Sequence, residues 1–217
     1  MIKNLNKYVD HTILKAFATE ADIEKFCADA IKYDFASVCI NPCHVALAAR
    51  LLKGTDVKVC TVIGFPLGAN TTEIKAAETD RAYFDGCDEF DMVINVGQLK
   101  SGNWEYVKRD IEAVVAAARG KTVKVIIETF YLNAEEIAKV SRIASDAGAS
   151  FVKTCTGFND GVAKVEDIKI MKANVDAHVK VKASTGIKTF ETAKELIEAG
   201  AERLGTSSGA VILEGNK

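Results

Sequence analysis

The chain has 217 residues, of which 48% are hydrophobic and 27% charged, and its formal net charge is −2. This composition is typical of a globular protein and excludes a disordered or collagen-like chain. The near balance of 28 basic and 30 acidic side chains leaves no strong basic field to bind nucleic acid. The longest apolar run has six residues, far from the roughly 20 that a membrane-spanning helix needs, so no membrane partner is expected.

The start of the chain lacks the apolar segment of a signal peptide, so we expect a cytoplasmic protein. In that compartment the six cysteines are expected to be reduced thiols rather than a disulfide scaffold. Only two prolines occur, and no linker rich in Ser, Gly and Pro divides the sequence. Residues 1–217 are therefore expected to form one domain.

Eight short runs rich in β-branched residues predict strands. Their starts lie 20 to 35 residues apart, which leaves room for one helix and two short loops between consecutive strands. In chain order the runs cover residues 8–11, 37–40, 57–63, 88–94, 123–128, 150–154, 179–183 and 202–205.

The stretches between these runs carry the signals of helix ends. Thr19, Asn133 and Thr189 are expected N-caps, and the first two have an acidic residue three positions on, as in a capping box. Pro42 suits a first helical position. Glycines are expected to end five helices in the left-handed conformation, at Gly54, Gly86, Gly120, Gly148 and Gly200.

Eight βα units in 217 residues predict an α/β fold, a closed (β/α)8 TIM barrel. A doubly wound parallel sheet is the alternative, but that fold usually has a glycine-rich nucleotide loop after its first strand. Here residues 10–15 contain no glycine, and neither GxGxxG nor a Walker loop occurs in the chain.

A weak internal repeat places charged residues at matching positions. Lys153 and Lys182 each begin a K-x-x-T-G pattern, and the spacing of other glycines puts Asp91 and Gly205 at similar heights on their strands. Catalytic groups of TIM barrels come from the C-terminal strand ends. A single such lysine could be a rim residue that reaches water. Two ammonium groups on neighbouring strands would instead lower each other's pKa, as a neutral lysine nucleophile requires.

Other polar residues are expected at the same end of the barrel. Asp91 lies within an apolar strand, where it either forms a structural ion pair or moves protons beside the lysines. Asp10 and Thr12 follow the first strand, and Asp10 either binds a backbone amide or lies near substrate. Cys39 ends the second strand, with its thiol at the mouth or packed inertly in the core.

Glycine and serine follow the last two strands, in residues 184–186 and 205–209. These loops are the usual phosphate site of a barrel, although the same residues also form ordinary turns. Cys39, Cys43 and His44 do not complete a metal-ligand pattern, and no GxSxG motif of a serine hydrolase occurs. We expect no metal and no cofactor.

The chain resembles the deoxyribose-phosphate aldolase family, class I aldolases on a (β/α)8 barrel, almost from end to end. The most specific matches are Phe-Val-Lys-Thr-x-Thr-Gly-Phe at residues 151–158 and Val-Lys-Ala-Ser at 181–184. Further matches lie at residues 10–12, 37–39, 62–68, 89–97, 124–128 and 205–207.

The resemblance implies reversible, metal-independent cleavage of 2-deoxy-D-ribose 5-phosphate to D-glyceraldehyde 3-phosphate and acetaldehyde, in deoxyribose phosphate catabolism. It implies Lys153 as the Schiff-base lysine, Lys182 as its partner and Asp91 as the proton-relay acid. We expect a homodimer or homotetramer. Residues implied near the substrate are Asp10, Thr12 and Cys39. Residues implied at the phosphate are Thr156, Gly157, Gly186, Gly205, Ser207 and Ser208.

Three features depart from the family pattern. Cys155 stands where serine is usual, and Thr185 stands where a second glycine is usual, which would alter how closely the phosphate is held. Some members end in a tail tyrosine that assists proton transfer, whereas the last tyrosine here is Tyr131. Three alternatives remain open: a Schiff-base aldolase or transaldolase for another sugar phosphate, a metal-dependent aldolase, and a non-catalytic phosphate-binding barrel.

Overall fold

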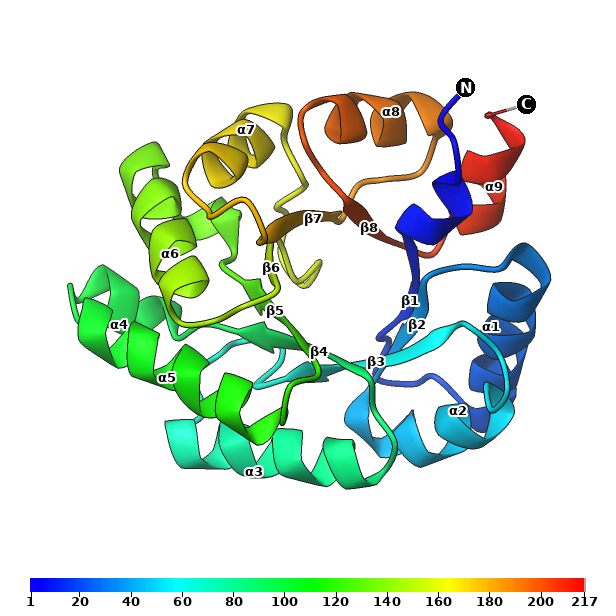
Figure 1. Ribbon diagram of the computed structural model, residues 1–217, viewed down its shortest axis with the longest axis horizontal. Coiled ribbons are helices and arrows are strands. Elements are labelled where there is room, and N and C mark those ends of the chain that lie inside the picture. The colour runs from blue at the N-terminus through cyan, green and yellow to red at the C-terminus, as the bar shows by residue number, and fades with distance from the viewer. Residues whose placement is uncertain (217) are drawn as a thin grey trace.

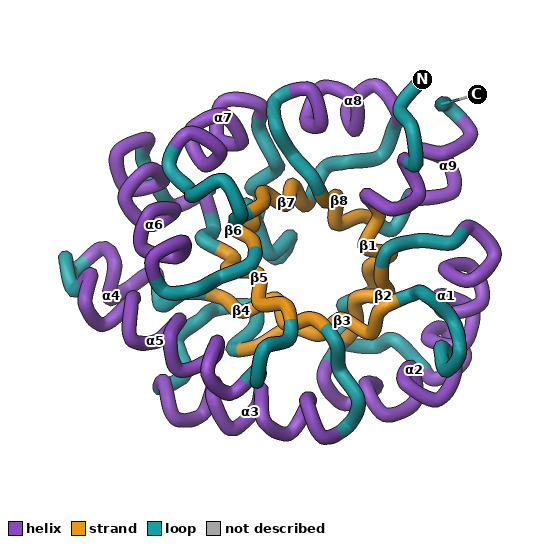
Figure 2. The backbone as a smooth tube through the Cα atoms, viewed as in Figure 1, coloured by secondary structure: helices purple, strands orange, loops and turns teal. Residues whose placement is uncertain are grey.

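The computed structural model describes residues 1–216, which contain a closed barrel of eight parallel strands in chain order (Figures 1 and 2). The C-terminal bound that we predicted for the domain, Lys217, lies outside the described residues. All eight predicted strands are confirmed, with ends shifted by at most two residues. The strands are β1 (Val9–Ile13), β2 (Ser37–Ile40), β3 (Lys58–Ile63), β4 (Glu89–Val93), β5 (Thr122–Ile126), β6 (Phe151–Lys153), β7 (Lys180–Ser184) and β8 (Arg203–Thr206).

Helices surround the ring of strands and cover its outer face (Figure 1). They are α1 (Glu20–Tyr33), α2 (Val45–Leu51), α3 (Thr72–Phe84), α4 (Val96–Lys100), α5 (Trp104–Ala117), α6 (Ala134–Asp146), α7 (Val165–Ala173), α8 (Phe190–Glu198) and α9 (Gly209–Glu214). Short 3-10 turns lie at Leu5–Tyr8, Pro42–His44 and Thr129–Tyr131. Within residues 1–216, none of these helices combines the length and the apolar character needed to cross a membrane.

The predicted helix ends are confirmed by their hydrogen bonds. Thr19 and Asn133 form complete capping boxes at the starts of α1 and α6. The Thr189 side chain accepts a hydrogen bond from the Thr192 backbone N–H at the start of α8. Pro42 occupies the start of a 3-10 turn. The five glycines expected to end helices all have φ between 83° and 118°, so each helix stops where the next strand must begin.

The two faces of each strand carry different residues, because side chains alternate along a strand. On β4, Phe90 and Met92 point outward into the apolar layer beneath the helices, where both are fully buried. Glu89 and Asp91 come from the other face and meet charged partners from other strands. The barrel therefore has an apolar outer core and a charged interior, and the interior is where chemistry is possible.

A buried ion pair in the outer layer packs against the start of the loop after β3. Lys75 on α3 donates to Asp110 on α5 at 2.5 Å and to the Val93 carbonyl oxygen at 2.9 Å, and both charged side chains are fully buried. Gly64 has φ of 63°, and a Cβ there would lie 2.8 Å from Lys75 Cε. Glycine is thus required where the chain leaves β3 and passes over this lysine.

Candidate functional site

The barrel interior contains a connected group of buried charges, which we call the interior charge cluster. Its members come from six strands, β1 and β4 to β8, and extend from the N-terminal strand ends to the C-terminal ends. Each is joined to another by at least one ion pair. The members are Asp10, Glu89, Asp91, Lys124, Lys153, Lys182 and Arg203.

Asp91 is the centre of the cluster. Its Oδ2 accepts hydrogen bonds from Lys153 at 2.8 Å and from Lys182 at 2.7 Å, and its Oδ1 accepts one from Lys124 at 2.9 Å. Burial alone would raise the pKa of Asp91, but Lys124, Lys153 and Lys182 outweigh it and hold that pKa well below its ordinary value. The carboxylate is therefore ionised and fixed between three ammonium groups.

Lys153 and Lys182 face each other directly in the β6–β7 register, as the repeat predicted. Lys182 Nζ contacts Asp10 as well as Asp91, and its side chain is fully buried. The expectation that the paired lysines lower each other's pKa is wrong for Lys182. Burial disfavours its charge, but Asp10 and Asp91 prevail and raise its pKa, so Lys182 is held as a cation.

Asp10 binds side chains rather than the backbone amide that was one of its two expected roles. Its Oδ1 accepts hydrogen bonds from Ser37 Oγ and from Arg203 Nη1, both at 2.6 Å, and its other oxygen contacts Lys182. The side chain is fully buried and lies beneath the cavity rather than at its surface. Burial would raise the pKa of Asp10, but Arg203 and the two lysines hold it below its usual range.

The N-terminal end of the cluster is closed by an arginine. Arg203 Nη2 lies 3.3 Å from Glu89 Oε1, while Arg203 Nη1 binds Asp10. Lys124 fills the space between the carboxylates, with Nζ 2.5 Å from Glu89, 2.9 Å from Asp91 and 3.6 Å from Asp10. Together these contacts make a continuous path of ion pairs from one end of the barrel to the other.

The charges of the cluster do not balance. It contains four basic side chains and three carboxylates, so one positive charge is in excess when every group is ionised. Lys124 contacts three of these carboxylates, whereas Lys182 and Arg203 contact two each. Lys153 contacts Asp91 alone, and shares that oxygen with Lys182. Lys153 is therefore the basic member of the cluster with the fewest carboxylate contacts.

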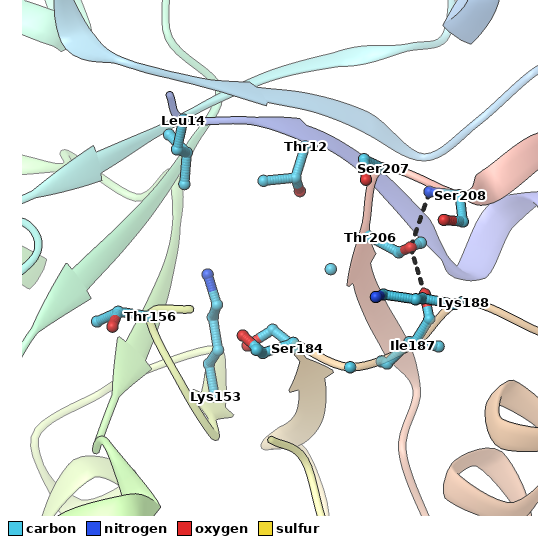
Figure 3. A pocket seen from close by; sticks show the side chains of 13 residues that line it. Thr12, Leu14, Lys153, Thr156, Ser184, Ile187, Lys188, Thr206, Ser207 and Ser208 are labelled. Atoms are coloured by element: carbon cyan, nitrogen blue, oxygen red, sulfur yellow. Dashed lines mark hydrogen bonds between the residues drawn. The ribbon is translucent and has the colours of Figure 1, made fainter. Parts of the chain in front are cut away.

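Lys153 also borders a cavity of about 200 Å³ at the C-terminal strand ends (Figure 3). Its ammonium end extends toward the open space between Thr12, Leu14 and Ser184 in that view. Of the residues implied at the phosphate, Thr156, Gly186, Gly205, Ser207 and Ser208 line this cavity. The remaining lining residues are Thr185, Ile187, Lys188 and Thr206.

Among the described residues, five that were named from the sequence do not line the cavity: Asp10, Cys39, Asp91, Gly157 and Lys182. Gly157 lies behind the lining, where a Cβ would come within 2.9 Å of Thr185 Oγ1. Thr185 itself has φ of 78°, a conformation that suits the glycine usual in the resembling family. With threonine at residue 185, residue 157 has no room for a side chain.

Sequence reasoning missed several residues that the fold brings to the site. Lys188 lines the cavity two residues after Gly186 and supplies a cation beside the serine loop. Lys124 carries the signal that marked Lys153 and Asp91, a charge within an apolar strand, and that rule would have found it. Arg203 gave no such signal, because it begins its strand and follows the polar residue Glu202.

Glu128 positions the loop that follows Lys153. It accepts hydrogen bonds from the Thr156 backbone N–H at 3.1 Å and from Thr156 Oγ1 at 2.5 Å, and it is 3% exposed. Its backbone is left-handed, with φ of 55°. Cys155 stands where serine is usual in the family. It is buried, and its Sγ lies 3.6 Å from Thr129 Oγ1.

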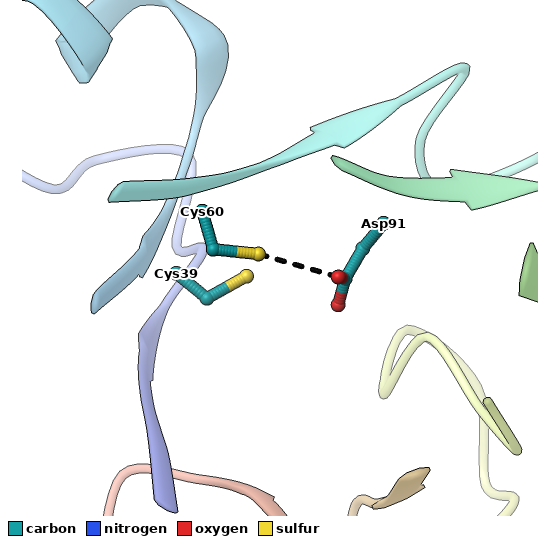
Figure 4. A group of neighbouring side chains, drawn as sticks. All are labelled: Cys39, Cys60 and Asp91. Carbon is teal, nitrogen blue, oxygen red and sulfur yellow. Dashed lines mark hydrogen bonds between the residues drawn. The ribbon is translucent and has the colours of Figure 1, made fainter. Parts of the chain in front are cut away.

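Cys39, Cys60 and Asp91 place one ligand atom each within 4.8 Å of one another (Figure 4). This donor set does not fit a metal ion. Cys60 Sγ donates to Asp91 Oδ1 at 3.2 Å, and all three nearby ammonium groups already bind that carboxylate. A further cation would have to enter next to those lysines. Burial also raises the pKa of Cys60 well above its ordinary value, which disfavours the thiolate that metals bind.

The chain is similar to known aldolases over nearly its whole length. The family model described as "DeoC/LacD family aldolase" matches residues 5–214. A protein of Clostridium novyi (strain NT) named deoxyribose-phosphate aldolase is 56% identical over 215 residues, which cover 99% of this chain and 97% of that protein. Its counterpart in Finegoldia magna is 55% identical, over 97% of this chain and 99% of that protein.

Solved structures of aldolases are also similar to this chain. The crystal structure of a putative deoxyribose-phosphate aldolase from Coccidioides immitis superposes with a TM-score of 0.95 and 40% identity, covering 98% of this chain and 86% of that one. The deoxyribose phosphate aldolase of Aeropyrum pernix, described as tetrameric, gives a TM-score of 0.90 and 31% identity, covering 97% of this chain and 89% of that one. With its barrel, buried lysine pair and lined cavity, the chain belongs to the DeoC/LacD family of aldolases.

Proposed function

We propose that the protein catalyses the reversible cleavage of 2-deoxy-D-ribose 5-phosphate to D-glyceraldehyde 3-phosphate and acetaldehyde through a Schiff base on Lys153. The observation that carries this proposal is the position of Lys153. It combines a place on the cavity wall with a single carboxylate contact in a cluster that has one excess positive charge. The names of the relatives supply the substrate.

The first step uses the free amine of Lys153. Its lone pair attacks C1 of the open-chain aldehyde, and the carbonyl oxygen takes up a proton to give a carbinolamine. Loss of water then leaves an iminium ion. Lys182, held as a cation by Asp10 and Asp91, lies next to this centre and is the proposed proton donor to the departing oxygen.

The second step breaks the C2–C3 bond. A base removes the proton of the C3 hydroxyl, the C2–C3 electron pair moves into the iminium, and glyceraldehyde 3-phosphate leaves. The enamine that remains is protonated at C2, and water hydrolyses the new iminium to acetaldehyde and free Lys153. Asp91 binds both lysines through one oxygen, which supports its role as the relay between them.

The phosphate is proposed to lie at the opposite wall of the cavity. Gly186, Gly205, Ser207 and Ser208 border that wall, and Lys188 adds a positive charge. A Cβ at Gly205 would lie 3.0 Å from Ser184 Cβ and 3.2 Å from Lys182 Cε, so glycine leaves backbone accessible beside the catalytic lysines. Gly157 lies next to Thr185 of this wall and stays a proposed contributor to the phosphate site.

One assay tests the proposed function directly. Purified protein is incubated with 2-deoxyribose 5-phosphate in the presence of EDTA, and glyceraldehyde 3-phosphate and acetaldehyde are both measured. The proposal requires equal amounts of the two products, with a rate that EDTA leaves unchanged. Cleavage that EDTA abolishes would favour a metal-dependent aldolase, and cleavage of other sugar phosphates only would reassign the substrate.

Two further properties belong to the same proposal. The protein forms a homodimer or homotetramer, supported by the tetramer described for the relative from Aeropyrum pernix, and light scattering after size-exclusion chromatography measures the mass. It works in the cytoplasm, supported by six cysteines that are all free thiols within the described residues. Fractionation of cells that express the chain tests that location.

A further inference from the structure

We propose that Arg203 and Glu89, at the N-terminal end of the barrel, set the pH at which Lys153 becomes a nucleophile at the C-terminal end. Arg203 favours the neutral amine and Glu89 favours the ammonium ion. Neither residue lines the cavity, so each acts as a positioning residue through the interior charge cluster. This inference rests on the proposed function, because it concerns the lysine that forms the Schiff base.

The connection runs through direct contacts between side chains. Arg203 binds Asp10, Asp10 binds Lys182, and Lys182 shares Asp91 Oδ2 with Lys153. Positive and negative groups alternate at every step along this path. The side chains between its ends are fully buried, and the Arg203 side chain is 14% exposed. Screening by water is therefore weak along the path, and a charge removed at one end is felt at the other.

The charge balance gives the direction of the effect. With four basic groups and three carboxylates, the cluster reaches neutrality when one lysine is deprotonated. Loss of Arg203 would make the cluster neutral with Lys153 still protonated, so the amine would form only at higher pH. Loss of the Glu89 charge would raise the excess to two positive charges, and the amine would form at lower pH.

Other polar groups face Lys153 and the cluster. The thiols of Cys39 and Cys60 come from β2 and β3, and those strands contribute no charged side chain to the cluster among the described residues. Hydrogen bonding with Cys60 lowers the pKa of Cys39. Lys188 lines the cavity, and Glu128 binds Thr156 at the edge of the cavity, so neither is a member of the cluster. The variants below leave all four of these groups in place.

The experiment measures imine formation as a function of pH. Protein is treated with acetaldehyde and borohydride over a pH series, and the ethyl group on the Lys153 peptide is counted by mass spectrometry. Arg203→Met should move the midpoint up by about one pH unit, and Glu89→Gln should move it down by about the same. A unit charge about 10 Å away, at an effective dielectric constant of about 20, produces a shift of that size.

Three control variants distinguish the effect of a removed charge from the effect of disturbed packing. Arg203→Lys keeps the charge and should keep the midpoint near that of the original protein. Arg81→Met and Glu198→Gln remove equal charges from exposed ion pairs on α3 and α8, and should leave the midpoint unchanged. A packing defect would not move the two interior variants in opposite directions. If Arg203→Met does not fold, Glu89→Gln alone still tests the inference.

The outcomes are distinct. Opposite shifts of the two interior variants, with the three controls unmoved, support the inference. Labelling of Lys153 in every variant with the same midpoint would overturn it and leave the proposed function intact. Absence of any label on Lys153 in the original protein would instead overturn the proposed function.

Discussion

Two buried lysine sites in this protein look alike in isolation. Lys75, between α3 and α5, is fully buried and bound to one carboxylate, Asp110, and to a backbone carbonyl. Lys153, inside the barrel, is 2% exposed and is also bound to one carboxylate, Asp91. Lys75 and Asp110 form a pair of equal and opposite charges away from the described cavities. Lys153 shares its partner with other cations and borders a cavity.

Burial and a shifted pKa do not by themselves identify a catalytic lysine. Burial lowers the pKa of Lys75 despite Asp110, whereas carboxylates raise the pKa of Lys182 despite its burial. Selection by lowered pKa alone would therefore choose the structural lysine. What distinguishes Lys153 is the unbalanced charge of its surroundings together with its access to a cavity.

The largest effect is expected from Lys153→Leu. Loss of the nucleophile should reduce the cleavage rate by at least about four orders of magnitude. The remaining cluster would have three basic groups and three carboxylates, so its charges balance and the fold should persist. Steady-state kinetics and a thermal melt check both parts. A variant that retains a substantial rate would move the nucleophile elsewhere.

Lys75→Met should lower stability and leave activity unchanged, which is the reverse of the outcome expected for Lys153→Leu. Asp110 would be left as an uncompensated buried charge, at a cost of about 3–5 kcal/mol in the free energy of unfolding. Activity per folded molecule should stay the same, since Lys75 lies outside the cavity. Urea unfolding and kinetics on the same samples measure the two effects. The double variant Lys75→Met, Asp110→Leu should recover most of the lost stability, and failure to recover it would show that the pair does more than compensate charge.

His11 is a third kind of buried titratable group, because neither of its ring nitrogens has a hydrogen-bond partner among the described residues. Burial lowers its pKa to about 4, with partial opposition from Asp29. The unfolded chain takes up a proton below about pH 6.5, while the folded protein resists protonation until about pH 4. The contribution of His11 to stability is thus complete above pH 6.5 and falls by about 3 kcal/mol as the pH drops to 4.

His11→Phe removes this titration and keeps an aromatic ring against Phe26, whose centroid lies 4.3 Å from that of His11. Urea unfolding at pH 7 and at pH 4.5 should show a smaller loss of stability on acidification in the variant than in the original protein. An equal loss in both proteins would mean that the buried carboxylates alone account for the acid sensitivity.

Ser207→Asp is expected to have the smallest of these effects, and it is confined to one substrate. It adds a negative charge at the cavity wall proposed for the phosphate. Activity on 2-deoxyribose 5-phosphate should fall by about 100-fold relative to activity on unphosphorylated 2-deoxyribose, from repulsion of about 2.7 kcal/mol. Equal losses on both substrates would argue against a phosphate at this wall.

Local patterns predicted much of the fold, because strands, caps and glycine helix ends depend on neighbouring residues. The register of Lys153 with Lys182 followed from a repeat in the sequence. The contacts of Asp10 with Ser37 and Arg203 could not be predicted, since they join strands 27 and 193 residues apart only after the barrel closes. The raised pKa of Lys182 was missed for the same reason, because it depends on both Asp10 and Asp91.

Chemical labelling of the active protein tests the Schiff-base role of Lys153 most directly. Acetaldehyde with borohydride should inactivate the enzyme and add one ethyl group, located on the peptide that contains Lys153. In Lys182→Leu the same peptide should still be labelled, but only at higher pH, because a neighbouring positive charge has been removed. A label found mainly on Lys182 would reverse the two roles. An enzyme that cleaves the substrate yet takes up no label would contradict the Schiff-base mechanism altogether.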